Sequence, residues 1–475
     1  MPGSFNRYLA LLRALFGNRI TRRILYGLNR VDGDGRPVLE KVLARYAGVG
    51  GSSLSCMIDT YILSLLIKIG VIIFRADEAQ AKEYLRDPSV RRGFILIFRG
   101  LSEYGPTVPQ KLPSPFLIVW NFTNMCNLRC IHCYQDAGRR MDNELTLGEK
   151  LRAVDMLDEA GVASIAFSGG EPLIHPHFLR VASEASSRGI YLAVATNGIA
   201  LSNMDYALKV RRAGVRYLEI SLDSPNRIEH DRFRGVEGAW DKTVRGIENA
   251  VKIGFTTAIA TTITKYNIDR VEDMVRLADE LGVGKIVFFN FIPVGRGRNI
   301  TEYDLSPLER EELLHELVRL NRRYRVEVLT TAPQYSRVSL QMSNGEAISP
   351  THFYIGGDPG IEALADFIGG CGAGRIYAAL QPNGDVSPCV FLPIRVGNIR
   401  ERSFIDIWRG SRVFRDLRDR DILGGYCGKC RYRYVCGGCR ARGYSYYDDY
   451  LAPDPGCIYL IREWNRLNHR YRSPQ

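Results

Sequence analysis

The sequence of 475 residues contains no run of eighteen or more residues without a charged side chain, which argues against a membrane-spanning helix. The apolar stretch 54–74 is the nearest in character to a membrane span, but it includes Asp59 and Lys68. The first residues, MPGSFNRYLALLRALFGNR, lack the apolar core and the small-residue cleavage site of a signal peptide. We therefore expect a cytoplasmic protein, a compartment in which disulfides are rare.

Composition narrows the class of protein further. A hydrophobic content of 45% and a charged content of 24% exclude a wholly disordered or collagen-like chain. The net charge of +12 is uneven, because residues 1–50 hold nine Lys or Arg against three Asp or Glu. A basic end can contact nucleic acid, an anionic membrane or an acidic partner. We expect no nucleic-acid partner, because the arginines of this basic end share a predicted helix with an apolar face and belong to no known nucleic-acid-binding motif.

Residues 1–112 are predicted to form a helical extension that is both apolar and basic. One predicted helix has an apolar face of Ile20, Ile24, Leu25 and Leu28 and a basic face of Arg19, Arg22, Arg23 and Arg30. Such a pattern is typical of an interfacial helix, so residues 1–100 are candidates for contact with lipid at the inner membrane face. A helical cap over the opening of the next domain is the alternative.

From Phe116 onward, strands alternate with helices. The predicted strands are 116–123, 163–169, 191–197, 216–223, 257–264 and 285–293, and the predicted helices between them include 147–161, 178–189 and 270–282. Six such units predict an α/β fold, a partial (β/α)6 TIM-like barrel, with its chemistry in the loops after the strands. We expect this barrel over 113–300, a helical bridging segment over 301–370, a cysteine-rich domain over 371–460 and a basic terminal helix over 461–475.

Ten of the eleven cysteines fall into short-spaced groups, which in a reducing compartment indicates metal ligands. The exception, Cys56, lies among apolar residues and is predicted to be a buried hydrophobe. The first group, Cys126, Cys130 and Cys133, follows the first barrel strand. Three thiolates can hold a [4Fe–4S] cluster and leave one iron open, whereas structural zinc needs a fourth ligand.

The loop CNLRCIHCY resembles the signature of the radical S-adenosylmethionine (SAM) superfamily. Three further motifs follow later strands in the order that this superfamily shows: FSGGEP (167–172), ATNG (195–198), and SLDSP (221–225) with HDRFRG (230–235). The resemblance covers about 116–300. Each of these motifs by itself could be a tight turn, a helix cap or a surface charge. Their occurrence together in this order indicates the superfamily far more specifically than any single motif does.

This resemblance implies roles for particular residues. Cys126, Cys130 and Cys133 would bind the radical cluster, and His132 would pack near the adenine of SAM. Gly169, Gly170 and Glu171 would receive the methionine ammonium group. Ser221 and Asp223 would hydrogen-bond the ribose or the methionine part, Arg234 would pair with the carboxylate, and Asn197 would line the same mouth.

The C-terminal cysteines resemble the SPASM extension of this superfamily, which holds two auxiliary clusters. The resemblance implies that Cys371, Cys389 and Cys439 bind the first auxiliary cluster and that Cys427, Cys430, Cys436 and Cys457 bind the second. A zinc ribbon is the alternative for four of these thiols. Two departures stand out. Only two residues separate Cys436 from Cys439, and no cysteine just precedes Cys371, so the first auxiliary cluster has either an open iron or a ligand other than cysteine.

The implied activity is reductive cleavage of SAM, giving a 5′-deoxyadenosyl radical that removes hydrogen from an unactivated C–H bond. The implied cofactors are SAM and three [4Fe–4S] clusters, with reduced ferredoxin or flavodoxin as electron donor under anaerobic conditions. No catalytic residue beyond the cofactor ligands is predicted. An iron–sulfur electron carrier is the non-enzymatic alternative, but a mere carrier would not need the SAM-binding motifs.

The substrate is predicted less directly. The apolar and basic extension favours a long apolar substrate, with modification or joining of membrane-lipid alkyl chains ranked first. The segment CGGCRARGYSYYDDYLAPDPGC resembles enzymes of the alternative heme and heme d1 pathways, which alter porphyrin side chains. A tetrapyrrole is therefore ranked second, and peptide or protein maturation third.

If the loop after the first strand holds the radical cluster, Cys126→Ala, Cys130→Ala and Cys133→Ala should each abolish SAM cleavage, because the cluster loses a ligand. The measurement is 5′-deoxyadenosine released by anaerobically reconstituted, dithionite-reduced protein. About twelve irons per chain are expected in the wild type and about eight in the triple variant. Cys56→Ala is the control and should keep both. Wild-type cleavage by the triple variant would contradict the assignment.

Overall fold

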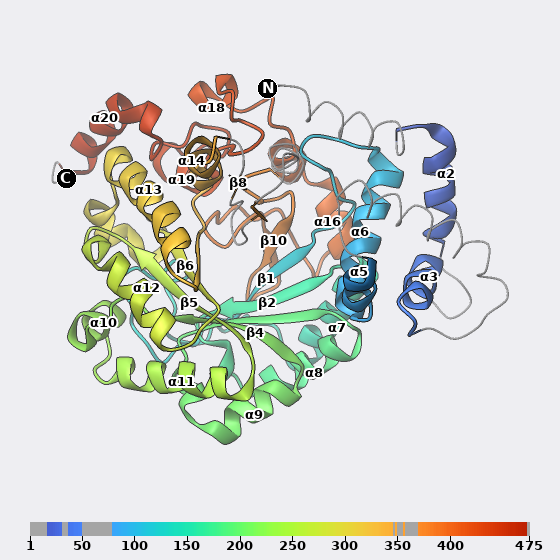
Figure 1. Ribbon diagram of the computed structural model, residues 1–475, viewed down its shortest axis with the longest axis horizontal. Coiled ribbons are helices and arrows are strands. Elements are labelled where there is room, and N and C mark those ends of the chain that lie inside the picture. The colour runs from blue at the N-terminus through green and yellow to red at the C-terminus, as the bar shows by residue number, and fades with distance from the viewer. Residues whose placement is uncertain are drawn as a thin grey trace.

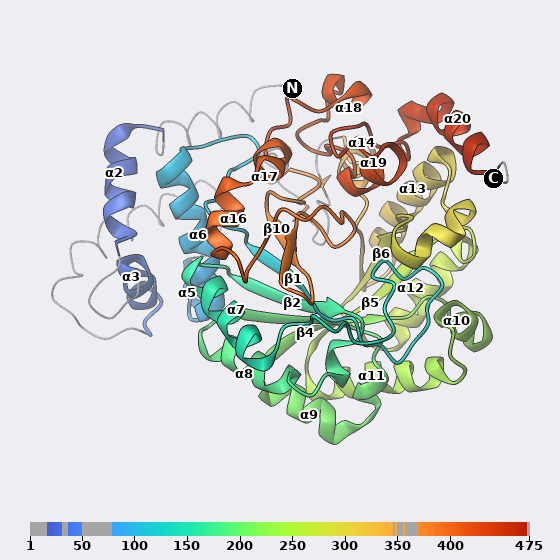
Figure 2. The same cartoon turned by 180° about the vertical axis from the view of Figure 1, so that it is seen from behind.

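The computed structural model describes residues 17–30, 37–49, 78–344, 347–348, 355–356 and 369–472 (Figures 1 and 2). The predictions made for Cys56 and for the apolar stretch 54–74 lie outside these residues. Among the helices that the structure describes, none is both long and apolar enough to cross a membrane.

The centre of the molecule is a parallel sheet in which six neighbouring strands follow one another in chain order. These strands are β1 (Leu117–Thr123), β2 (Ser164–Gly169), β3 (Tyr191–Thr196), β4 (Val215–Ser221), β5 (Thr256–Ile263) and β6 (Lys285–Asn290). Each lies within one to three residues of its predicted bounds. The partial barrel expected from the sequence is confirmed, and the sheet is open because its end strands do not pair with each other.

The sheet continues beyond the six predicted strands at both ends. β7 (Glu327–Thr330) pairs in parallel with β6, and β10 (Tyr377–Leu380) pairs in parallel with β1. β11 (Asp385–Ser387) and β12 (Gly397–Asn398) then add antiparallel strands. The expectation of a helical segment over 301–370 is therefore incomplete, because β7 lies within it. These strands have two to four residues, too few to show a period in the sequence.

Helices cover the outer face of the sheet, as Figure 1 shows. They are α7 (Leu147–Glu159), α8 (Phe178–Ser187), α9 (Met204–Arg212), α10 (Arg227–Arg234), α11 (Ala239–Ile253), α12 (Val271–Glu280) and α13 (Pro307–Arg323). α14 (Gln334–Met342) lies next to α13, on the side of the cysteine-rich region. α7 and α13 each begin with a capping box, formed by Thr146 with Glu149 and by Ser306 with Glu309. β8 (Ala347–Ile348) and β9 (Ile355–Gly356) pair antiparallel in a separate two-stranded sheet.

The main core lies between the sheet and these helices. Its aromatic centre joins β1, β2 and α8: the ring centroids of Phe122 and Phe167 lie 5.5 Å apart, and those of Phe167 and Phe178 lie 5.4 Å apart. Edge-to-face contacts of this kind add to the burial of the rings. The packing fixes the strand ends, from which the loops of the site emerge.

The N-terminal helices have a core of their own. α2 (Arg19–Leu28), α3 (Val38–Tyr46), α5 (Glu78–Leu85) and α6 (Pro88–Tyr104) bury a cluster that includes Leu25, Leu28 and Leu39. The predicted apolar face is therefore only partly buried, because Ile20 is 76% exposed and Ile24 is 38% exposed.

Polar contacts join these helices to one another and to the barrel. Arg22 on α2 donates hydrogen bonds to the carbonyls of Ser102 and Glu103 at the end of α6. Arg92 on α6 pairs with Asp158 on α7 at 2.6 Å. The N-terminal helices thus lie against one side of the barrel (Figure 1).

The C-terminal region packs beside the same sheet. It contains α16 (Phe404–Gly410), α17 (Arg412–Leu417), α18 (Gly425–Lys429), α19 (Arg440–Tyr447) and α20 (Ile461–Arg472). The predicted terminal helix is confirmed as far as Arg472.

Leu39→Ala should loosen the N-terminal helices, because Leu39 has no exposed surface and its truncation leaves a cavity. We expect a loss of about 2–5 kcal/mol in the stability of this unit, measured by hydrogen exchange of α2, α3 and α6. Ile20→Ala is the matched control and should have little effect, because Ile20 is 76% exposed. The iron content should be unchanged in both. Equal loss of protection in the two variants would contradict the description of this core.

Candidate active site

The three cysteines predicted to bind the radical cluster lie in a loop that begins directly after β1. Cys126, Cys130 and Cys133 share an apolar neighbourhood with Leu128 and Ala239. Burial raises the pKa of Cys126 to about 12 and also raises that of Cys130. Iron is bound by the thiolate, so cluster assembly must displace these protons.

Two side chains from outside hold the backbone of this loop. Glu144, only 4% exposed, accepts hydrogen bonds from the Thr123 hydroxyl at 3.0 Å and the Asn124 N–H at 2.7 Å. Arg296, in η5 (Gly295–Tyr303), donates to the Cys130 carbonyl at 2.8 Å. Sequence reasoning missed both residues. Arg296 is 166 positions from Cys130, and no motif signals such a contact.

The FSGGEP loop is joined to the cysteine loop by backbone hydrogen bonds. The Gly170 N–H donates to the Thr123 carbonyl at 2.7 Å, and the Glu171 N–H donates to the Met125 carbonyl at 2.8 Å. A Cβ atom on Gly170 would lie 2.2 Å from the Met125 oxygen. Gly169 has φ of +113°, and a Cβ atom there would lie 2.6 Å from the Thr123 oxygen. Both glycines are therefore required by the close approach of the two loops.

The Glu171 side chain extends this contact to the loop after β3. Its carboxylate accepts hydrogen bonds from the Leu173 N–H at 3.0 Å, the Thr196 hydroxyl at 2.8 Å and the Asn197 N–H at 2.7 Å. Burial raises the pKa of Glu171 to about 7, although these hydrogen bonds oppose the shift. Asn197 in turn donates to the Asn127 side chain in the cysteine loop at 2.8 Å. The loops that follow β1, β2 and β3 therefore contact one another.

Asp223 and Arg234 form a buried ion pair next to the cysteine loop. Arg234 Nε lies 2.5 Å from Asp223 Oδ2, and Asp223 Oδ1 accepts a hydrogen bond from the Thr262 N–H at 2.8 Å. Arg234 Nη1 faces the Cys130 sulfur at 3.7 Å. Burial lowers the pKa of Arg234, but the charges of Asp223 and Cys130 raise it above its usual value. Ser221, the last residue of β4, lies near this pair in sequence and is partly exposed.

His132 lies at one end of a row of three stacked rings beside the cysteines. Its ring stacks on Phe233 with centroids 4.2 Å apart, and Phe233 stacks on Tyr266 at 5.4 Å. Burial lowers the pKa of His132 well below its usual value, so the imidazole is neutral. Its Nδ1 atom is buried and has no hydrogen-bond partner.

The three thiols predicted for the first auxiliary cluster are brought together. Cys371, Cys389 and Cys439 belong to one buried apolar cluster. The hydroxyl of Tyr377 donates a hydrogen bond to the Cys389 sulfur at 3.1 Å. Burial raises the pKa of Cys389 to about 11.

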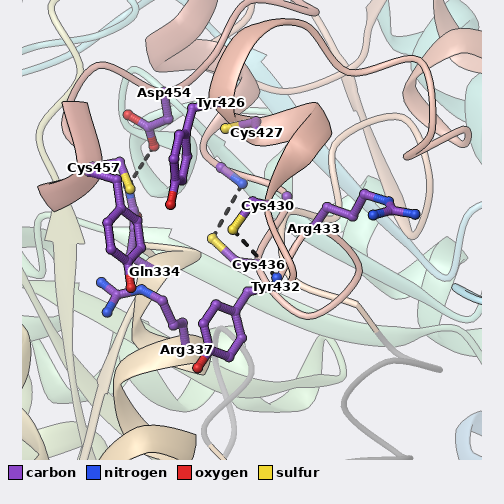
Figure 3. A pocket seen from close by; sticks show the side chains of 13 residues that line it. Gln334, Arg337, Tyr426, Cys427, Cys430, Tyr432, Arg433, Cys436, Asp454 and Cys457 are labelled. Carbon is purple, nitrogen blue, oxygen red and sulfur yellow. Dashed lines mark hydrogen bonds between the residues drawn. The ribbon is translucent and has the colours of Figure 1, made fainter. Parts of the chain in front are cut away.

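The four thiols predicted for the second auxiliary cluster line one pocket. Figure 3 shows the sulfur atoms of Cys427, Cys430, Cys436 and Cys457 around the same space. Burial raises the pKa of Cys457 to about 12, and Arg440 faces the Cys427 sulfur at 3.7 Å.

The short spacing between Cys436 and Cys439 has a structural explanation. Gly437 and Gly438 have φ of +69° and +63°, a left-handed conformation that glycine adopts without strain. The chain therefore turns sharply enough for Cys436 to face the second set of thiols while Cys439 joins the first.

Tyr134 lies between the radical loop and the first auxiliary thiols. It directly follows Cys133 and packs against the apolar cluster that contains Cys371, Cys389 and Cys439. The Tyr134 hydroxyl donates a hydrogen bond to the Asn121 side chain at 2.9 Å, and its ring lies 4.8 Å from that of Phe391. Sequence reasoning did not identify this residue.

A buried charge network fixes the cysteine-rich region against the barrel. Asp304, with no exposed side-chain surface, pairs with Arg310 at 2.8 Å and with Arg442 on α19 at 2.6 Å, and it accepts a hydrogen bond from the Tyr446 hydroxyl. Arg442 also lies 3.5 Å from Asp454, which accepts a hydrogen bond from the Cys439 N–H at 2.7 Å. The network thus reaches the backbone of a predicted ligand.

The donor chemistry of these sites fits iron–sulfur clusters. In the part of the chain that the structure describes, no three His, Cys, Asp or Glu side chains are arranged to hold one metal ion. The ten thiols form three sets instead: two lie in apolar clusters, and the third lines a pocket that also includes Gln334, Arg337 and Asp454. Soft thiolates are the usual ligands of iron–sulfur clusters.

Comparison with family models gives two matches. The model of the radical SAM superfamily matches residues 120–278, and the model of the SPASM iron–sulfur cluster-binding domain matches residues 371–431.

Several curated relatives match most of the chain. The AdoMet-dependent heme synthase of Methanosarcina barkeri is 37% identical over 351 residues, which is 73% of this chain and 97% of that protein. The Fe-coproporphyrin III synthase of the same organism is 30% identical and covers 74% of this chain and 92% of its own. The mycofactocin maturase MftC of Mycolicibacterium smegmatis is also 30% identical, over 73% of this chain and 83% of its own.

Among solved structures, Streptococcus suis SuiB bound to S-adenosylmethionine superposes with a TM-score of 0.58 at 16% identity, covering 88% of this chain and 92% of that one. At 16% identity, the superposition supports a common fold and nothing further.

Gly170→Ala should disrupt the junction of the two loops, because the new Cβ would meet a backbone oxygen that cannot move aside cheaply. We expect a loss of about 1–3 kcal/mol in stability and at least a tenfold loss of SAM cleavage. Gly284→Ala is the matched control, because a Cβ atom there meets nothing within 4 Å. Full activity of Gly170→Ala would show that the loops need not touch.

Proposed function

Because the chain belongs to the radical SAM superfamily and carries its SPASM iron–sulfur domain, we propose that it modifies a side chain of a tetrapyrrole by hydrogen abstraction. The observation that carries this proposal is the 37% identity that extends over 97% of an AdoMet-dependent heme synthase. The membrane-lipid substrate ranked first from the sequence has no counterpart among the relatives compared. We therefore rank the tetrapyrrole first and peptide maturation second, the latter because of the mycofactocin maturase relative.

The enzyme uses S-adenosylmethionine and three [4Fe–4S] clusters. In this proposal Cys126, Cys130 and Cys133 bind the radical cluster, and the other seven thiols bind the auxiliary clusters in the two sets described above. When bound and reduced, the radical cluster supplies the electron that cleaves SAM to methionine and a 5′-deoxyadenosyl radical. The protein holds the reacting groups together and excludes water.

The contacts of the site refine the roles expected for single residues. Gly169 and Gly170 bring exposed backbone close to the cysteine loop, which suits an ammonium group. Arg234 is already paired with Asp223 and faces Cys130, so its proposed role is to stabilise the cluster thiolate rather than the SAM carboxylate. Ser221, at the partly exposed end of β4, remains the candidate for contact with the ribose.

The proposed place of the substrate is between the radical loop and the first auxiliary thiols. Tyr134 and Phe391 are partly buried there, with ring centroids 4.8 Å apart, and such an aromatic pair suits the edge or face of a flat macrocycle. The Asn121 amide donates hydrogen bonds to the Gln135 side chain at 2.7 Å and the Gln381 side chain at 3.0 Å, which fixes both glutamine side chains in the same region. Such a position lets the auxiliary cluster accept the electron that a substrate radical must lose.

Electron delivery is assigned to reduced ferredoxin or flavodoxin. The second set of thiols lines a pocket whose rim includes Tyr426 and Tyr459, which are 40% and 44% exposed. An acidic carrier suits the basic residues Lys429 and Arg431 of the same loop.

No helix that the structure describes is long and apolar enough to cross a membrane. Contact of the N-terminal helices with lipid is a proposal that we rank below the tetrapyrrole function.

The test is anaerobic incubation of reconstituted protein with SAM, dithionite and Fe-coproporphyrin III, followed by mass spectrometry. A changed porphyrin mass should appear together with 5′-deoxyadenosine, and Cys126→Ala should produce neither. Parallel reactions with extracted lipids and with peptides serve as comparison. Release of 5′-deoxyadenosine with unchanged porphyrin, but with a modified lipid or peptide, would refute the tetrapyrrole proposal.

A further inference from the structure

Tyr377 occupies a fixed position beside the first auxiliary thiols. It is the first residue of β10, and its N–H donates to the Gly372 carbonyl at 3.2 Å. Its ring lies so close to Gly372 that a Cβ atom there would be 3.1 Å from Tyr377 Cδ1. Gly372 directly follows Cys371, so the ring is held next to one predicted ligand.

The Tyr377 hydroxyl faces the sulfur of another predicted ligand. It donates a hydrogen bond to Cys389 Sγ at 3.1 Å, and the same sulfur accepts a second hydrogen bond from the Phe391 N–H at 3.4 Å. The Cys389 sulfur therefore accepts hydrogen bonds from two donors, one of them the Tyr377 hydroxyl.

The short distance decides between two roles for this hydroxyl. Ligands on two corners of one [4Fe–4S] cube diverge, so an oxygen 3.1 Å from Cys389 Sγ is too close to bind a neighbouring iron while Cys389 binds its own. The same distance suits an O–H···S hydrogen bond. Tyr377 therefore acts on a ligand and not on the metal.

The charge around this site favours a more negative cluster. Arg375 is 1% exposed, and its Nε and Nη2 atoms have no hydrogen-bond partner. Its charged neighbours are Arg420 and Cys371. A buried guanidinium with two unpartnered nitrogens is costly unless an anion lies nearby, and a thiolate-bound cluster would provide one.

We infer that Tyr377 raises the reduction potential of the first auxiliary cluster through its hydrogen bond to Cys389. A hydrogen bond to a ligating sulfur stabilises the reduced cluster, which carries one more negative charge, and such bonds are among the main determinants of cluster potential. The inference rests on the proposed ligand set and not on the proposed substrate. Tyr377 is a positioning residue, since it contacts neither substrate nor iron.

The test compares reconstituted holoenzymes by potentiometric titration followed by electron paramagnetic resonance. Tyr377→Phe keeps the ring and removes the donor. It should retain about twelve irons per chain, and one of the three cluster potentials should shift to a more negative value. Site-specific replacement of Tyr377 by a fluorinated tyrosine, which is a stronger donor, should shift the same potential in the opposite direction.

Tyr450→Phe is the matched control. Tyr450 packs against the same apolar cluster as Tyr377, but its hydroxyl donates to Asp416 at 2.8 Å and not to a sulfur. The three potentials should be unchanged in this variant.

Three results would overturn the inference. They are unchanged potentials in Tyr377→Phe, an equal shift in Tyr450→Phe, or loss of iron in Tyr377→Phe, which would make Tyr377 a ligand. No porphyrin is present in the assay, so failure of the tetrapyrrole proposal would leave this outcome unaffected.

Discussion

Parallel pairing of β10 with β1 is the contact on which the arrangement of the thiols depends. Tyr377 pairs with Leu117 and Leu380 with Trp120, so the cysteine-rich region enters the barrel sheet as a further strand. β1 leads into the radical loop, whereas β10 begins six residues after Cys371. One short ladder of backbone hydrogen bonds therefore sets the positions of two predicted clusters relative to each other. Together with the buried charge network around Asp304, this ladder holds the auxiliary thiols beside the radical loop.

Buried positive charge accompanies the thiols throughout the molecule. Arg234 faces Cys130, Arg440 faces Cys427, and Arg420 donates to the Cys371 carbonyl. All three side chains are 7% exposed or less. Burying a guanidinium is expensive unless a negative group lies within reach, and thiolate-bound clusters are such groups. The fold is thus adapted to carry negative charge in its interior, which electron transfer through auxiliary clusters requires.

The N-terminal helices remain the part of the chain least connected to the chemistry. Their leucines form a separate core, and their contacts with the barrel are ion pairs and hydrogen bonds such as that of Arg92 with Asp158. The heme synthase relative matches 73% of this chain, so about a quarter of the chain has no counterpart in it. The amphipathic helices of this extension therefore do not identify the substrate, because such helices serve equally as a cap or as a lipid contact.

The sequence alone determined the α/β class, the six central strands within a few residues, and the short-spaced groups of cysteines, whereas the division of ten cysteines into three ligand sets came from the resemblance to the radical SAM and SPASM families. Strand periodicity and short cysteine spacings are local signals, and each reflects a single element or loop. Only the tertiary structure decided what surrounds those sets. Arg296 reaches Cys130 across 166 positions, β7 and β10 are too short to show a period, and Tyr377 finds Cys389 only because β10 turns back through β11. Contacts between residues far apart in the chain depend on how the elements pack, and no repeating pattern in the sequence predicts which elements will pack together.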